Sequence, residues 1–83
     1  MQVELRKQPE KYLDKCTQNM HEKLINALSG LESWQGDIKR LEGSKSEYRL
    51  KIPPFRIIFT YVKGGNVITV KKISTRGDAY KKG

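Results

Sequence analysis

The side chains best suited to chemistry in this sequence are cations, and they gather in strand-like segments of its second half. Arg49 and Lys51 alternate with apolar residues, and Arg56 follows after a short connection. Because alternate side chains of a strand point to opposite faces, these three cations would share one face of a sheet. Arg76 and Tyr80 follow the last strand-like segment and could fold over the same face. Such a cluster of cations would bind a phosphate backbone.

The second half of the chain lacks the residue types that form the catalytic centres of most hydrolases. It contains no histidine, no cysteine and no pair of acidic residues placed for two-carboxylate chemistry. No metal and no other cofactor is therefore expected. RNA carries its own nucleophile, the 2′-OH, so its cleavage needs only positioning, proton transfer and cations that stabilise a pentavalent phosphate.

Two residues of the first half also have reactive side chains. His21 lies beside Met20 in a helical pattern and is more typical of a helix surface than of a catalyst. Cys16 is the only cysteine, and its neighbours have no metal-ligand spacing. We interpret Cys16 as a small core residue.

The net charge of +8 comes entirely from the second half of the chain. Residues 1–38 hold five lysines and arginines against six acidic residues, whereas the remaining residues hold twelve against three. A basic surface on one side of a protein attracts phosphate backbones. The alternative is that the charge only keeps a small protein soluble and that the strand cations are simply solvated.

The first half is expected to form one short strand and two helices. Residues 2–7 alternate apolar and polar side chains, as in a strand, and residues 9–17 have the apolar spacing of a short amphipathic helix. Asn19 and Glu22 have the spacing of a capping box at the start of a longer helix, which would end before Gly36.

The second half is expected to form three strands. Residues 36–47 read as a polar connection, and residues 48–52 then alternate apolar and basic side chains. The Pro53-Pro54 pair forces a tight connection to residues 55–62, and the turn KGGN leads into residues 67–74. The pattern predicts an α+β fold, with the order strand-helix-helix-strand-strand-strand, in a single domain over residues 1–83.

The expected location of the protein is the cytoplasm. No apolar run approaches the roughly 18 residues of a membrane span. The N-terminal sequence MQVELRKQPEKY has no apolar region of a secretory signal.

The order of motifs resembles the RelE/ParE superfamily of bacterial toxin–antitoxin toxins, in particular its RelE-like branch. The segments that carry the resemblance are GDIKRLEG, YRLKIPPFRIIFTYV and ISTRGDAY, and it extends over essentially the whole chain. It implies a small twisted antiparallel sheet packed against an N-terminal αα-hairpin. It also implies a type II toxin that enters the ribosomal A site and cleaves mRNA without a metal.

The resemblance assigns roles to five residues. Lys51 and Tyr80 would transfer protons, Arg56 and Arg76 would hold the scissile phosphate and stabilise its charge, and Arg49 would bind the RNA backbone. Lys71 and Lys72 are also expected to bind RNA.

Two positions depart from the pattern of the superfamily. Thr75 stands where many relatives have a histidine, and Phe55 stands where a tyrosine is common. Thr75 removes one possible base, which leaves the assignment of acid and base open. A ParE-like toxin that inhibits gyrase without cleaving RNA, and a non-catalytic module that binds RNA or the ribosome, are the alternative functions.

A protein partner is expected as well. Ile58 and Val62 share the strand face of Arg56, so apolar surface lies beside cations. An acidic, partly disordered antitoxin could cover that surface as it folds. The alternative is that the C-terminal segment of the chain itself covers it.

Overall fold

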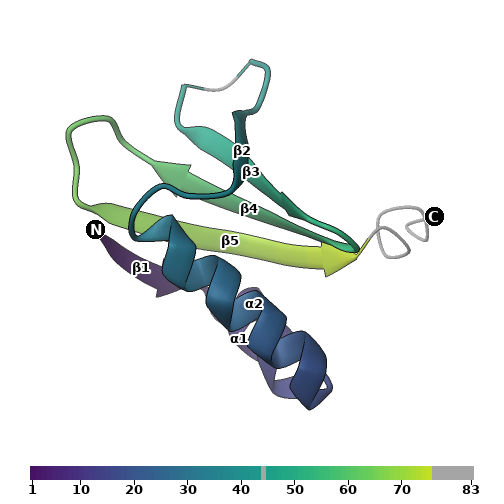
Figure 1. Ribbon diagram of the computed structural model, residues 1–83. Helices are drawn as coiled ribbons and strands as arrows, with labels where there is room; N and C mark the ends of the chain where they lie inside the picture. The colour runs from purple at the N-terminus through teal and green to yellow at the C-terminus, as the bar shows by residue number, and fades with distance from the viewer. Residues whose placement is uncertain (44, 76–83) are drawn as a thin grey trace.

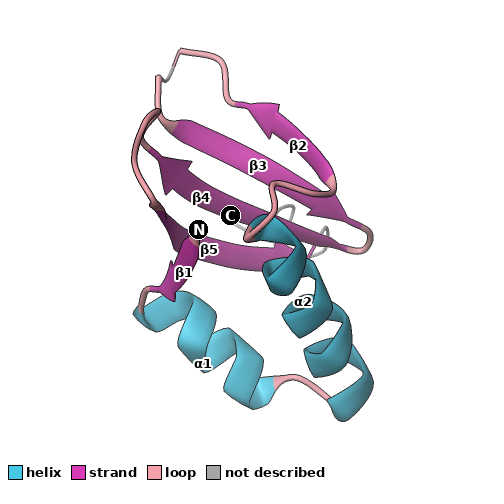
Figure 2. Cartoon of the chain, turned by 60° about the vertical axis from the view of Figure 1, so that its left-hand side comes forward, coloured by secondary structure: helices cyan, strands magenta, loops and turns pink. Residues whose placement is uncertain are grey.

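A five-stranded sheet with two helices on one side forms the fold (Figures 1 and 2). The computed structural model describes residues 1–43 and 45–75. The strands lie in the order β1-β5-β4-β3-β2. The elements are β1 (Gln2–Leu5), α1 (Lys7–Lys15), α2 (Gln18–Leu31), β2 (Asp37–Arg40), β3 (Glu47–Ile52), β4 (Phe55–Tyr61) and β5 (Val67–Thr75).

The hydrophobic core lies between the helices and one face of the sheet. Buried residues alternate with more exposed ones along β4 and the first half of β5, because successive side chains of a strand point to opposite faces, and β3 contributes the buried Leu50. The helices contribute residues spaced three and four apart, which lie on one side of a helix. The buried apolar residues are Leu13, Leu24, Leu28, Leu31, Leu50, Phe55, Ile57, Phe59, Ile68, Val70 and Ile73.

The predicted α+β class is confirmed, and two details of the sheet differ from the prediction. The sheet is mixed rather than wholly antiparallel, because β1 pairs parallel with β5. The segment interpreted as a polar connection contains β2, which pairs antiparallel with β3. Ile38 is the only apolar residue of β2 and is half-buried, so this edge strand has too little alternation to be told from a loop.

Both helices begin slightly before the residues that the sequence indicated. Thr17, not Asn19, caps α2, and its Oγ1 accepts a hydrogen bond from the Met20 N–H at 3.3 Å. Helix α1 begins at Lys7, so Pro9 occupies its first turn, where a missing N–H costs no helical hydrogen bond. Both helices are close to their predicted positions.

Two short connections fix the register of the three central strands. Pro53 and Pro54, joined by a cis peptide bond, link β3 directly to β4. Lys23 of α2 donates a hydrogen bond to the Pro53 carbonyl at 2.8 Å, which ties this turn to the helix. Between β4 and β5, Gly64 adopts φ +89° and Gly65 N–H donates to the Val62 carbonyl.

A strained turn brings the end of α2 over the sheet. Trp34 has a φ of 57°, and its ring packs against Tyr48, Phe59 and Tyr61. Gly36 follows with a φ of 118°, and a Cβ there would lie 2.7 Å from Leu50 Cδ1. Only glycine fits this backbone conformation and this close approach.

We predict that Gly36→Ala lowers the free energy of unfolding by about 1–3 kcal/mol, because alanine is strained at this φ and its methyl group meets a buried leucine. Gly30→Ala is the matched control, since a Cβ there would meet Gln35 at an ordinary 3.6 Å and alanine favours the helix by up to about 1 kcal/mol. Urea unfolding of both variants checks this. Equal stabilities would contradict the prediction.

Candidate nucleic-acid interface

The register of β3 and β4 brings the three predicted cations together on the side of the sheet away from the helices. Lys51 lies directly opposite Arg56, and Arg49 lies opposite Ile58 on the same face. Directly opposed residues have Cβ atoms about 4.5–5.5 Å apart. The side chains of Lys51 and Arg56 are exposed. We call the outward side chains Arg49, Lys51, Arg56 and Lys72 the cationic face.

Strand β5 extends the cationic face because of a β-bulge. The register between β4 and β5 shifts between Ile58 and Phe59. Val70 and Ile73 are buried, whereas Lys71 and Lys72 between them are both exposed. A bulge therefore places two consecutive lysines on the solvent side, which strict alternation would not allow.

The two lysines of β5 differ in their surroundings. Lys72 lies opposite Ile58, beside the cations of β3 and β4. Lys71 forms an ion pair with Glu47 of β3, and both side chains are partly exposed. The contribution of such a surface pair to stability is at most about 1 kcal/mol, so an incoming anion can compete for Lys71.

The strands carry three acidic residues on this side of the sheet, more than the sequence suggested. Glu4 of β1 is one of them, because it alternates with Val3 and Leu5, which pack against the core. Asp37 lies opposite Lys51, and Glu47 pairs with Lys71. Asp37 was assigned to a connection because β2 was not predicted. The carboxylates reduce the repulsion among the cations without matching them in number.

Two residues of this face were missed by the sequence analysis. Lys39 of β2 lies opposite Arg49, and Ser74 of β5 lies opposite Arg56. The alternation of Ser74 with Lys72 was a signal that could have identified it. Lys39 could not be assigned without β2.

Arg49 is the most enclosed of these cations. Its side chain is half-buried, and its Nε–H is buried and donates to no acceptor in the described part of the chain. A half-buried stem restricts the directions that the guanidinium group can take. Arg49 is therefore the least mobile anchor for an anion on the cationic face.

The remaining predicted site residues, Arg76 and Tyr80, lie outside the described residues, and their roles stay predictions. Thr75 is the last residue of β5 and lies opposite Phe55, which is buried on the helix side. Position 75 thus belongs to the other side of the sheet from Lys51 and Arg56. Its occupation by threonine does not change the composition of the cationic face.

The reactive residues of the first half lie where the sequence placed them. Cys16 packs against the core, and burial raises the pKa of its thiol. A raised pKa keeps the thiol protonated at neutral pH, so Cys16 is not an activated nucleophile. His21 is exposed on α2. Over residues 1–43 and 45–75, no group of three or more His, Cys, Asp or Glu side chains could hold a metal ion.

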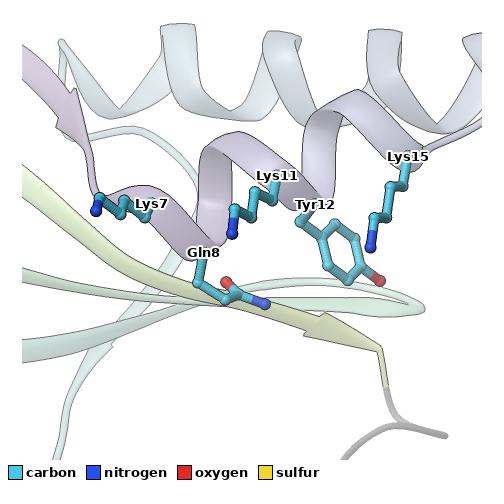
Figure 3. A pocket seen from close by; sticks show the side chains of 5 residues that line it. All are labelled: Lys7, Gln8, Lys11, Tyr12 and Lys15. Carbon is cyan, nitrogen blue, oxygen red and sulfur yellow. The ribbon is translucent and has the colours of Figure 1, made fainter.

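A second basic feature lies on α1. Lys7, Lys11 and Lys15 recur at four-residue intervals and line a pocket together with Gln8 and Tyr12 (Figure 3). Residues four apart lie on one side of a helix, so this spacing could have identified the lysines from the sequence.

Gln8 fixes α1 to the edge of β5 in this pocket (Figure 3). Its Nε2 donates to the Ile73 carbonyl at 2.9 Å, and the Ile73 N–H donates to its Oε1 at 2.9 Å. One side chain thereby satisfies both backbone groups at the point where β1 no longer pairs with β5.

We predict that Gln8→Ala lowers the free energy of unfolding by about 1–3 kcal/mol, because two partly buried backbone groups lose their partners. Gln8→Glu is the matched variant. A carboxylate can accept from the Ile73 N–H but cannot donate to the Ile73 carbonyl, so the loss should be intermediate at neutral pH. Urea unfolding and amide exchange at Ile73 measure both effects. An unchanged exchange rate in Gln8→Ala would contradict this role.

Comparison with solved structures identifies the fold as that of the RelE toxins. The RelB–RelE antitoxin–toxin complex of Methanococcus jannaschii matches with a TM-score of 0.76 and 17% identity, over 98% of this chain and 99% of the other. The RelE–RelB complex of Pyrococcus horikoshii OT3 matches with a TM-score of 0.74 and 21% identity, over 92% of this chain and 94% of the other. The isolated E. coli RelE toxin matches with a TM-score of 0.72 and 20% identity, over 98% of this chain and 92% of the other.

A sequence comparison agrees with the structural one. The toxin candidate RelE1 of Methanocaldococcus jannaschii is 44% identical over 45 residues, which are 54% of this chain and 50% of that protein. The match thus spans about half the length of the curated relative. No family model matches the chain. The resemblance to the RelE/ParE superfamily predicted from the sequence motifs is confirmed by these two comparisons.

The helices of the described residues are short and amphipathic. None of them has the length and apolar character that crossing a membrane requires.

Proposed function

We propose that this chain is the toxin of a type II toxin–antitoxin system and a ribosome-dependent endonuclease that cleaves mRNA without a metal. The observation that carries the proposal is the register that sets Lys51 opposite Arg56, with Arg49 on the same face, in a RelE-type fold. The fold alone does not determine an activity, but three convergent cations on one open face are suited to a phosphate backbone.

The proposed reaction uses the 2′-OH of the RNA as the nucleophile. The 2′-OH loses its proton and attacks the adjacent phosphorus, and the bond from phosphorus to the 5′ oxygen breaks. The leaving oxygen takes up a proton, so the products are a 2′,3′-cyclic phosphate and a 5′-OH. Lys51 and Tyr80 are the proposed proton-transfer residues. Arg56 and Arg76 would stabilise the charge of the pentavalent phosphate.

The proposed role of the ribosome is to align the mRNA on the cationic face. The side chains of Lys51, Arg56 and Lys72 are exposed. Such an open surface can bind a phosphate, but it does not by itself align the 2′-OH with the leaving oxygen. Positioning contributes a large part of the barrier reduction in such reactions. We propose that mRNA held in the ribosomal A site provides this alignment.

We predict that Lys51→Ala lowers the rate of mRNA cleavage by about 10²–10⁴-fold, because it removes a proton-transfer group. Arg56→Ala should lower it by about 10²–10³-fold through lost charge stabilisation. Primer extension on an mRNA in a purified translation system measures both rates. Intact mRNA with the unaltered protein, in reactions that translate normally, would overturn the proposed function.

Lys63→Ala is the matched control for these variants. Lys63 is exposed in the turn after β4, at the other end of that strand from Arg56. The substitution removes one positive charge, as Lys51→Ala does, but leaves the cationic face unchanged. The cleavage rate should therefore stay within about threefold of that of the unaltered protein. A loss equal to that of Lys51→Ala would show that net charge, rather than position, controls the activity.

An antitoxin is the proposed protein partner. The matching structures from Methanococcus jannaschii and Pyrococcus horikoshii OT3 are complexes of RelE with RelB. In this chain, Ile58 is half-buried beside Arg49 and Lys72 on the cationic face, and Val62 just past β4 is 69% exposed. An acidic, partly disordered protein could pair its carboxylates with the cations and bury this apolar surface.

We predict that co-expression with the product of a neighbouring gene relieves growth arrest, and that Val62→Asp weakens the purified complex at least about tenfold. The aspartate loses apolar contact and repels an acidic partner. Lys63→Gln changes the net charge by the same amount at the adjacent position and should weaken binding less. Calorimetric titration measures the affinity of each variant for the antitoxin. Equal losses would show that Val62 lies outside the interface.

A further inference from the structure

The lysines of α1 take no part in the proposed reaction. Lys7, Lys11 and Lys15 recur at four-residue intervals, and all three side chains are exposed. Together with Gln8 and Tyr12 they line a pocket of about 440 Å³ (Figure 3). We call Lys7, Lys11 and Lys15 the lysine row.

Two contacts of α1 hold the lysine row in a fixed place against the sheet. Gln8 bonds to both backbone groups of Ile73. The ring of Tyr12 lies edge-on to that of Phe55, with the ring centroids 6.3 Å apart. Four residues of a helix rise by about 6 Å, so the row presents positive charge at regular intervals. Such a series suits the regularly spaced phosphates of a nucleic-acid backbone.

The lysine row is not neutralised within the described part of the chain. In residues 1–43 and 45–75, its three side chains make no hydrogen bond or ion pair. Glu10 and Asp14 of α1 are exposed, and among the same residues they form no ion pair and do not line the pocket. A phosphate backbone would displace water and counterions from the row rather than break an ion pair among these residues.

The surroundings of the lysine row favour RNA over a protein partner. Protein interfaces have a core of apolar side chains, whereas interfaces with nucleic acids are polar and strongly positive. Within the described residues, no large apolar side chain that is exposed belongs to α1; those side chains are Met1, Ile25, Trp34, Val62 and Val67. The row thus offers charge without the apolar anchors that an antitoxin segment would bury.

The lysine row and the cationic face belong to opposite sides of the sheet. Helix α1 packs on the helix side through Leu13, which is buried in the core (Figure 2). Lys51 and Arg56 lie on the outer side. The two basic surfaces can therefore contact two different RNA segments at the same time.

We propose that the lysine row binds the phosphate backbone of a second RNA segment, separate from the strand that the cationic face holds for cleavage. In the ribosome-dependent reaction, this segment belongs to the RNA of the ribosome itself. The row then sets the affinity of the protein for the ribosome and leaves the chemical step unchanged. This inference rests on the proposed function, since it assumes that the ribosome is the site of action.

Lys11→Gln combined with Lys15→Gln tests the inference, because glutamine removes the charge and still favours a helix. Sedimentation with purified ribosomes measures the affinity over a range of salt concentrations. The double variant should bind at least about fivefold more weakly at low salt. The slope of log affinity against log salt concentration should fall by about 1–2, since each lost phosphate contact removes roughly 0.7–0.9. Adding Lys7→Gln should lower the slope by about one more.

The cleavage kinetics provide a second readout. In the double variant, the ribosome concentration that gives the half-maximal rate of mRNA cleavage should rise by a factor similar to the loss of affinity. The maximal rate should stay within about twofold of that of the unaltered protein, because the lost contact is the same in the ground state and the transition state. A lower maximal rate with unchanged affinity would overturn the inference.

Lys45→Gln combined with Lys63→Gln is the matched control. Both lysines are exposed, neither belongs to α1 or to the cationic face, and the change in net charge is the same. The affinity of this variant for ribosomes should stay within about twofold of that of the unaltered protein. Equal losses in the two double variants would show that overall charge, rather than the lysine row, attracts the ribosome. That result would overturn the inference.

The outcomes distinguish the inference from the proposed function. Suppose that the unaltered protein cleaves mRNA and that the α1 double variant, folded by circular dichroism, keeps its affinity for ribosomes. The inference would then be overturned and the proposed function would stand. Weaker binding of the antitoxin with unchanged ribosome affinity would show that α1 is a protein interface, and would overturn the inference as well. Ribosome binding that depends on the lysine row, without mRNA cleavage by the unaltered protein, would contradict the proposed function alone.

Discussion

The alternation of side chains along β3 and β4 is the constraint on which the rest of the structure depends. Leu50 and Ile57 lie opposite each other on the helix side, and Lys51 and Arg56 lie opposite each other on the outer side. A shift of one residue would bury the cations and expose the core, at a cost of many kcal/mol. The same hydrophobic contacts that fold the protein therefore hold the cationic face in register.

The cationic face is tolerated rather than favoured by the fold. Like charges opposite each other on a sheet are destabilising, and Asp37 and Glu47 relieve only part of the repulsion. Burial of the core aromatic residues, each with roughly 200 Å² of surface, stabilises the fold by more than the repulsion among the cations destabilises it. The arrangement is what would be expected if the face is stabilised further by an anionic ligand. Binding of that ligand would then also stabilise the folded state.

The sequence predicted the elements with strong alternation and missed those defined by tertiary contacts. Residues 48–52 alternate clearly and Arg56 follows the short Pro53-Pro54 connection, so the shared face of Arg49, Lys51 and Arg56 could be predicted. Strand β2 has one half-buried apolar residue and is a strand only because β3 lies beside it. The entry into β2 depends on the positive φ of Trp34 and on the close approach of Gly36 to Leu50, neither of which has a sequence period.

The most direct test of the account is the chemistry of the cleaved ends, because it reports which oxygen attacked the phosphorus. In the proposed reaction, the cationic face positions and stabilises a phosphate, and the RNA supplies the nucleophile. Mass spectrometry of mRNA fragments from a purified translation system should show 2′,3′-cyclic phosphates, or the 3′-phosphates formed by their opening, and 5′-hydroxyl ends. Fragments with 3′-hydroxyl and 5′-phosphate ends would show that water attacked instead, and would contradict the account.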